Sequence, residues 1–153
     1  TGQSVFVGML DGESAVYPHF VGNPAVSARL AQESTRRRAH ATALGRAMAA
    51  LDPAIERRLR QQASVGHGAQ AMRAVHEFDR AIDGFRRYGV AASRDSVAPG
   101  LSGFAAPIRT LAGRPVAALV VAGPTASLIS GTDRISRLLP AAAARVSRLV
   151  GTG

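Results

Sequence analysis

The sequence predicts an α+β domain in which helices pack on an antiparallel sheet. Three observations support this class: two strands open the chain, helical patterns fill its middle, and further strands precede a closing amphipathic helix. The expected order is two strands, helices, three strands and one helix. Hairpin strands with helices gathered between and after them are typical of an antiparallel sheet covered by helices. Such a sheet can leave a concave face for a small molecule.

The opening strands are predicted from two β-type segments on either side of a glycine turn. Residues 3–9 form the first strand, and residues 14–20 form the returning one. Gly12 lies between them and supplies the positive φ of a tight turn. Residues 22–40 are polar and irregular in pattern, so no element is predicted there.

Three helices are expected next. Thr42 is a suitable N-cap for a helix over residues 43–51, and residues 53–62 form another, because the proline at its start fits the first helical turn. Residues 69–88 form the clearest helix, and Gly89 provides its C-terminal stop. The apolar face of this helix, with helical spacing, consists of Met72, Val75, Phe78, Ile82 and Phe85.

Bounds can be given for two of the three later strands and for the last helix. Residues 102–110 form one strand, and residues 115–122 form another, whose run of Val, Ala and Leu is typical of a buried strand. Gly123 ends it. Thr132 or Asp133 caps the final helix. The apolar stripe of that helix consists of Ile135, Leu138, Leu139, Ala142, Val146 and Leu149.

Length and composition exclude several classes of protein. The 153 residues fit one domain, and 46% hydrophobic with 19% charged residues is typical of a globular chain. Cysteine is absent, which excludes disulfide scaffolds, thiol nucleophiles and thiolate metal sites. The sequence has neither an apolar run long enough for a membrane span nor a signal-peptide pattern, so we expect a cytoplasmic protein with no membrane partner.

The chain is strongly basic, with a net charge of +9, and all of its cationic side chains apart from histidine are arginine. A basic balance raises the expectation of an anionic partner. Aromatic residues make up only 5% and tryptophan is absent, so the stacking platform that binds single-stranded nucleic acid is missing. The run Arg36, Arg37 and Arg38 is interpreted either as a solvated basic surface or as contacts to DNA phosphates.

No arrangement of residues indicates catalysis or metal binding. The four histidines lack metal-ligand spacing, and there is no Gly-x-Ser-x-Gly nucleophile motif. Asp79 and Asp83 stand four residues apart on one predicted helix, but several arginines share that helix and a solvated face explains the pair better. We therefore expect no enzyme activity, no cofactor and no metal.

Two parts of the chain carry a resemblance to a known family. The first part is residues 40–51, His-Ala-Thr-Ala-Leu-Gly-Arg-Ala-Met-Ala-Ala-Leu. The second begins with Arg-Tyr-Gly-Val at residues 87–90, continues over residues 99–108, and runs from residues 113–119 to the Ala-Gly-Pro of residues 122–124. In this order and at this separation they resemble the C-terminal effector-binding domain of the IclR family of bacterial transcription regulators, over nearly the whole chain.

The resemblance implies a GAF-like fold, an antiparallel sheet with flanking helices and a ligand pocket on the sheet. It also implies a small-molecule effector and a homodimer or homotetramer. Operator DNA would be contacted only through an N-terminal winged helix-turn-helix domain, which is absent from this sequence. We thus expect residues 1–153 to form one effector-binding domain.

The resemblance further places the pocket between the sheet and the loop that leads into the helix over residues 43–51. Backbone N–H groups at the start of that helix are placed to hold a carboxylate, since helix N-termini attract anions. Val120 and Ala122 replace serines that are frequent in the family and share one strand face, which favours a roomier, less polar pocket for an aromatic or longer hydrophobic acid. The candidate ligand-binding residues are Ala43, Leu44, Gly45, Ser93, Leu101, Gly103, Val120 and Ala122.

Some alternatives remain open at this point. His40 and Arg46 are either contacts to the acid group of a ligand or structural residues. The whole chain is alternatively a small-molecule-binding or scaffold domain with no transcriptional role, since related sensor folds serve other proteins. A third hypothesis, a weak nucleic-acid-binding module, rests on the net charge alone.

Overall fold

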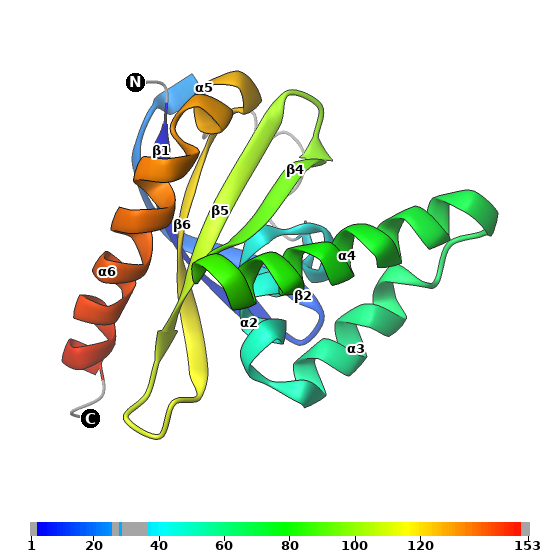
Figure 1. The fold of residues 1–153 in the computed structure, drawn as a ribbon, viewed down its shortest axis with the longest axis horizontal. Coiled ribbons are helices and arrows are strands. Elements are labelled where there is room, and N and C mark those ends of the chain that lie inside the picture. The colour runs from blue at the N-terminus through cyan, green and yellow to red at the C-terminus, as the bar shows by residue number, and fades with distance from the viewer. Residues whose placement is uncertain (1–2, 26–27, 29–36, 151–153) are drawn as a thin grey trace.

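Six antiparallel strands form the sheet that organises the protein (Figure 1). The computed structural model describes residues 3–25, residue 28 and residues 37–150. The strands are β1 (Ser4–Asp11), β2 (Ser14–Gly22), β3 (Arg37–Arg38), β4 (Ala91–Ala98), β5 (Leu101–Arg109) and β6 (Pro115–Pro124). Their order across the sheet is β3-β2-β1-β6-β5-β4. The predicted α+β class with an antiparallel sheet is confirmed.

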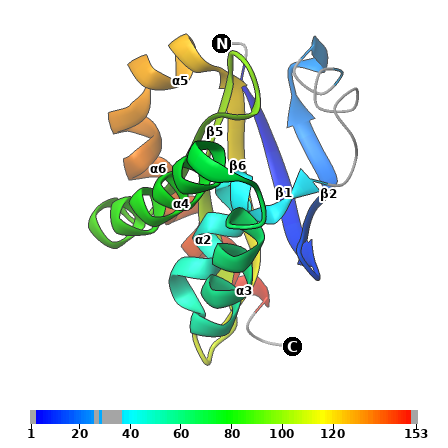
Figure 2. The same ribbon diagram turned by 90° about the vertical axis from the view of Figure 1, so that its right-hand side faces the viewer.

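Helices cover both faces of this sheet. They are η1 (Ala39–Ala41), α2 (Ala43–Leu51), α3 (Pro53–Ala63), α4 (Gly68–Tyr88), α5 (Thr125–Ser130) and α6 (Thr132–Val150). One hydrophobic cluster joins the sheet to α2, α3 and α4, and a second joins it to α5 and α6. Figure 2 shows α5 and α6 to the left of β5 and β6. No helix in the described part of the chain is long and apolar enough to cross a membrane.

The predicted opening hairpin is present, and its second strand is longer than expected. Asp11 pairs with Ser14 across a turn in which Gly12 has φ 61°. β2 continues past Pro18 to Gly22, because the register shifts there and leaves the proline outside regular pairing.

The three middle helices lie where the sequence predicts them, within one residue at each end. Gly89 ends α4 with φ 75°, and its N–H donates to the carbonyl of Phe85. The expectation that Met72 belongs to the apolar face of α4 is wrong, since Met72 is 74% exposed. The first half of α4 projects beyond the sheet together with α3 (Figure 1). The buried side chains of this helix, Phe78, Ala81, Ile82 and Phe85, all belong to its second half.

The last third of the chain differs from the prediction in three ways. β4 takes the place of the strand without assigned bounds, and α5 follows β6 directly although no helix was predicted there. Thr132 and Asp133 lie inside α6, whose first turn instead hydrogen-bonds to the carbonyl of Gly131. In the predicted stripe Ile135 and Leu139 are buried, but Leu138 and Leu149 are exposed, because α6 touches the sheet along a narrow line.

Candidate functional site

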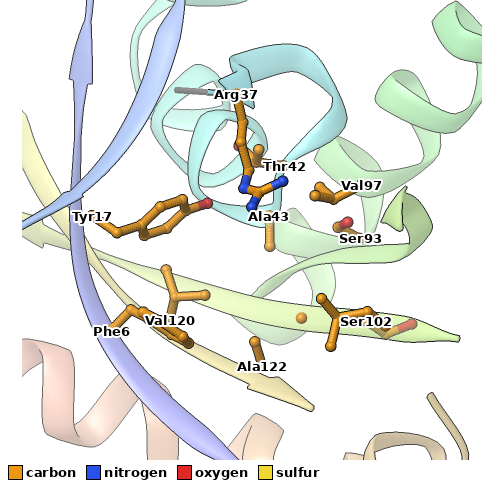
Figure 3. Close-up of a pocket in the computed structure, with 12 residues that line it drawn as sticks. Phe6, Tyr17, Arg37, Thr42, Ala43, Ser93, Val97, Ser102, Val120 and Ala122 are labelled. Carbon is orange, nitrogen blue, oxygen red and sulfur yellow. The ribbon is translucent and has the colours of Figure 1, made fainter. Parts of the chain in front are cut away.

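A small cavity lies between the sheet and the N-terminus of α2 (Figure 3). Its volume is about 40 Å³, enough for a few water molecules. Strands β1, β2, β5 and β6 supply its floor, and β3, β4 and α2 close it. The lining residues are Phe6, Tyr17, Arg37, Thr42, Ala43, Ser93, Val97, Leu101, Ser102, Gly103, Val120 and Ala122.

The structure brings six of the eight sequence-predicted residues to this cavity, namely Ala43, Ser93, Leu101, Gly103, Val120 and Ala122. The other two have structural roles. Leu44 is fully buried in the hydrophobic cluster under α2 and does not line the cavity. Gly45 packs against η1, where an added Cβ would lie 2.0 Å from the carbonyl oxygen of Ala39.

The proposed carboxylate cradle at the start of α2 is also corrected in part. Thr42 caps the helix, as predicted, and its side-chain oxygen accepts the Gly45 N–H at 3.0 Å. That N–H is therefore already used. The Thr42 hydroxyl in turn donates to the carbonyl of Ala39 at 2.9 Å. These two hydrogen bonds hold the turn that forms this wall of the cavity. They also occupy one of the backbone N–H groups that could otherwise donate to an anion.

Arg37 is the most informative residue that the sequence analysis missed. It is only 8% exposed, and Figure 3 shows its guanidinium directed into the cavity beside the hydroxyl end of Tyr17. The interpretation of the arginine run as a solvated surface is wrong for this position. β3 pairs antiparallel with β2, Arg37 opposite Ala15, which turns Arg37 inward and leaves Arg38 exposed. Arg36 lies outside the described residues.

Tyr17 adds a neutral hydroxyl to the same end of the cavity. Burial raises its pKa to about 12, although a hydrogen bond with Thr42 and the positive charge of Arg37 both act to lower it. The phenol therefore stays protonated near neutral pH. Together, Arg37, Tyr17 and Thr42 form the polar end of a cavity whose remaining walls are mostly apolar.

The expectation of a roomy pocket finds no support in this volume. Phe6 and Val97, both missed by the sequence analysis, line the cavity, Phe6 beside Val120 and Val97 on the side of Ser93 (Figure 3). Phe6 faces Val120 across the β1–β6 pairing, a neighbour that the sequence alone does not reveal. The enclosed part of this pocket therefore holds no more than a few water molecules.

Ser102 lines the cavity but is committed to other contacts. Its hydroxyl lies 2.8 Å from that of Thr125, which donates to Asp95 at 2.7 Å. Asp95 also accepts the N–H of Gly100 and adopts φ 54°. These bonds hold the β4–β5 connection against the start of α5.

His40 and Arg46 have structural partners and do not line the cavity. Nδ1 of His40 lies 2.9 Å from the side-chain oxygen of Gln62, which also accepts the His40 N–H. Arg46 is buried and donates to the carbonyls of His40 and Ala92 at 2.9 Å each. Among residues 3–25, 28 and 37–150, no three His, Asp or Glu side chains are grouped so that they could hold a metal ion.

Comparison with known proteins agrees with this architecture. The family model "Bacterial transcriptional regulator IclR C-terminal" matches residues 1–148. The glycerol operon regulatory protein of Streptomyces coelicolor is 26% identical over 156 residues, which cover 100% of this chain and 61% of that protein. The chain thus spans about three fifths of the length of this curated relative.

Solved structures share the fold. A transcriptional regulator from Rhodococcus sp. RHA1 has a TM-score of 0.72 at 25% identity, covering 98% of this chain and 62% of that one. The IclR protein of Thermotoga maritima has a TM-score of 0.75 at 21% identity, covering 99% and 62%. A double mutant of the inducer-binding domain of PobR from Acinetobacter, in complex with 3-hydroxybenzoic acid, has a TM-score of 0.73 at 20% identity, covering 97% and 90%.

The sheet, the flanking helices and the cavity on the sheet define a GAF-like domain. The chain belongs to the family of C-terminal, effector-binding domains of IclR-type bacterial transcription regulators, as the match over residues 1–148 shows. This family is a class of regulator domain and not a class of enzyme.

Proposed function

We propose that this domain senses a small hydrophobic molecule that carries an acid group, and that it binds this molecule in the cavity beside α2. One observation carries the proposal: a buried arginine, Arg37, is directed into a cavity with otherwise mostly apolar walls. A guanidinium binds a carboxylate through two parallel hydrogen bonds, and these are strong where water is excluded. An uncharged ligand would accept weaker hydrogen bonds from the same group.

The arrangement of the walls gives the ligand an orientation. Its acid group meets Arg37 and the hydroxyl of Tyr17, and its apolar body lies against Phe6, Val120 and Ala122. A double mutant of the PobR domain, which has the same fold, is described in complex with 3-hydroxybenzoic acid, and this supports an aromatic acid as the ligand class.

The small volume links binding to a change of conformation. Because the cavity holds only a few water molecules, a larger ligand favours an arrangement in which the lining has moved apart. A ligand shifts a protein between states by its difference in affinity for them. We propose that the favoured state alters the position of DNA-binding domains attached to this one.

The remaining parts of the proposal concern the whole regulator. The chain spans 61% of a curated operon regulator, which supports a separate N-terminal domain that contacts operator DNA. We also propose that the whole regulator assembles into dimers or tetramers and acts in the cytoplasm. The alternative is a small-molecule-binding or scaffold domain with no transcriptional role.

A thermal-shift panel of aromatic acids, keto acids and short acyl compounds tests the proposal. A ligand that binds only the folded state raises the midpoint in a saturable way. We expect stabilisation by hydrophobic acids and weaker stabilisation by their uncharged amides. Tight binding of glyoxylate or pyruvate, without any binding of aromatic acids, would contradict the ligand class. No shift from any compound would leave a structural role or a sensor of another ligand class.

A further inference from the structure

A second cluster of charge lies outside the effector cavity, at the free edge of the sheet. β4 is the last strand in the sheet order, and a cleft of about 360 Å³ runs between it and α4. Three arginines line this cleft: Arg46 from α2, Arg80 from α4 and Arg94 from β4. The one acidic residue among the lining residues is Glu77.

Arg46 gives the cleft a fixed, buried cation. Arg46 is only 3% exposed. Its Nε and Nη1 groups donate hydrogen bonds to the backbone carbonyls of His40 and Ala92. Its nearest carboxylate, Glu77, is 3.9 Å away and half-exposed. Burial lowers the pKa of Arg46 to about 10, and Glu77 offsets only part of that effect. The guanidinium stays charged at neutral pH and is incompletely compensated.

The other two arginines increase this imbalance. Within residues 3–25, 28 and 37–150, neither Arg80 nor Arg94 forms an ion pair. Three guanidinium groups and one carboxylate leave two positive charges around one cleft. Arginine forks match the tetrahedral oxygens of phosphate and bind them in pairs of hydrogen bonds.

We infer that this cleft is a second binding site, for a compact dianion of the phosphate type, either free phosphate or a phosphate monoester. The site is distinct from the effector cavity. Ser93 faces that cavity, whereas its neighbours Ala92 and Arg94 line the cleft on the other side of the strand. Arg37 takes no part in it. The inference therefore stands whether or not the effector proposal is correct.

The test uses isothermal titration with inorganic phosphate and with methyl phosphate at about pH 8, where both are dianions. Sodium chloride keeps the ionic strength constant. The double substitution Arg80→Gln and Arg94→Gln removes two exposed charges and leaves the buried anchor in place. The matched control, Arg57→Gln with Arg58→Gln, removes two exposed charges from α3. Arg37→Leu serves as the control for the effector cavity.

We expect saturable binding to the wild type, to the α3 control and to Arg37→Leu, and binding about tenfold weaker in the cleft variant. Tighter binding of methyl phosphate than of inorganic phosphate would indicate an ester as the ligand, and preference for inorganic phosphate would indicate the free ion. Three results would overturn the inference: no saturable binding, equal loss in both double variants, or loss in Arg37→Leu. If no saturable binding is found, the arginines are better explained as charges that keep the exposed edge strand β4 from pairing with another chain.

Discussion

At the residue scale, Gly45 shows how tightly the entry to α2 is packed. A Cβ at this position would lie 2.0 Å from the carbonyl oxygen of Ala39, so Gly45→Ala forces the backbone of η1 to move. We expect a loss of about 3 kcal/mol in the free energy of unfolding, measured by urea titration. Gly84→Ala is the matched control, because no atom lies within 4 Å of its added Cβ, and it should be neutral or stabilise α4 by up to about 1 kcal/mol. Equal effects of both changes would contradict this packing.

His40 supplies a prediction about pH. Burial lowers its pKa below the ordinary value of 6.5, and the hydrogen bond with Gln62 offsets only part of this effect. The unfolded chain therefore takes up a proton at higher pH than the folded chain. Above 6.5 the residue is neutral in both states, and stability falls as the pH decreases through 6.5 toward the folded pKa.

The measurement is the free energy of unfolding across this pH range in wild type, His40→Gln and His19→Gln. We expect His40→Gln to flatten the acid side of the curve. His19 is exposed on β2 and serves as the control that keeps the slope. A His40→Gln curve with the same slope as wild type would show that another group causes the pH dependence.

Single residues also mark the limit of what the sequence predicts about the site. Val120 and Ala122 could be assigned to the cavity, because strand alternation places them on one face. Arg37 could not, since its inward direction depends on pairing with Ala15, a residue more than twenty positions away in the chain. Adjacent Arg38 has the same chemistry and is exposed. The type of residue alone therefore does not distinguish the buried arginine from the exposed one.

At the scale of elements, α2 joins the sheet to the cavity, and its cap decides where it begins. The Thr42 side chain accepts the Gly45 N–H at 3.0 Å and donates to Ala39. We expect Thr42→Ala to lower the free energy of unfolding by about 1–2 kcal/mol, and Thr42→Ser to retain most of the stability, because serine keeps both hydrogen bonds. Thermal denaturation of the two variants checks this, and equal losses would indicate that the methyl group and not the cap matters.

The predicted helices and strands agree with the structure where local sequence signals are strong. Proline and glycine mark the limits of α3 and α4, and the sequence places both helices almost exactly as observed. No bounds were predicted for β4, because the polar residues Ser93, Arg94, Asp95 and Ser96 lack the apolar pattern of a buried strand. This composition is tolerated because β4 lies at the edge of the sheet. α5 is a six-residue helix whose formation follows from packing of Leu128 and from the fold around it.

At the scale of the whole molecule, the sheet separates two environments. One face carries the cavity under α2, and the other packs against α5 and α6. The order of strands brings β1 beside β6, so that Phe6 meets Val120 and Ala122 although it lies far from them in sequence. The order of strands across a sheet is a property of the fold and not of any local pattern, which is why half of the cavity wall was missed.

The central claim is that Arg37 holds the acid group of an effector. Isothermal titration of the most stabilising acid from the panel, and of its primary amide, tests this directly in wild type, Arg37→Leu and the neighbouring control Arg38→Gln. We expect Arg37→Leu to weaken binding of the acid by about tenfold to a hundredfold, with the amide little changed and the control like wild type. Equal affinity of wild type and Arg37→Leu for the acid would contradict the claim.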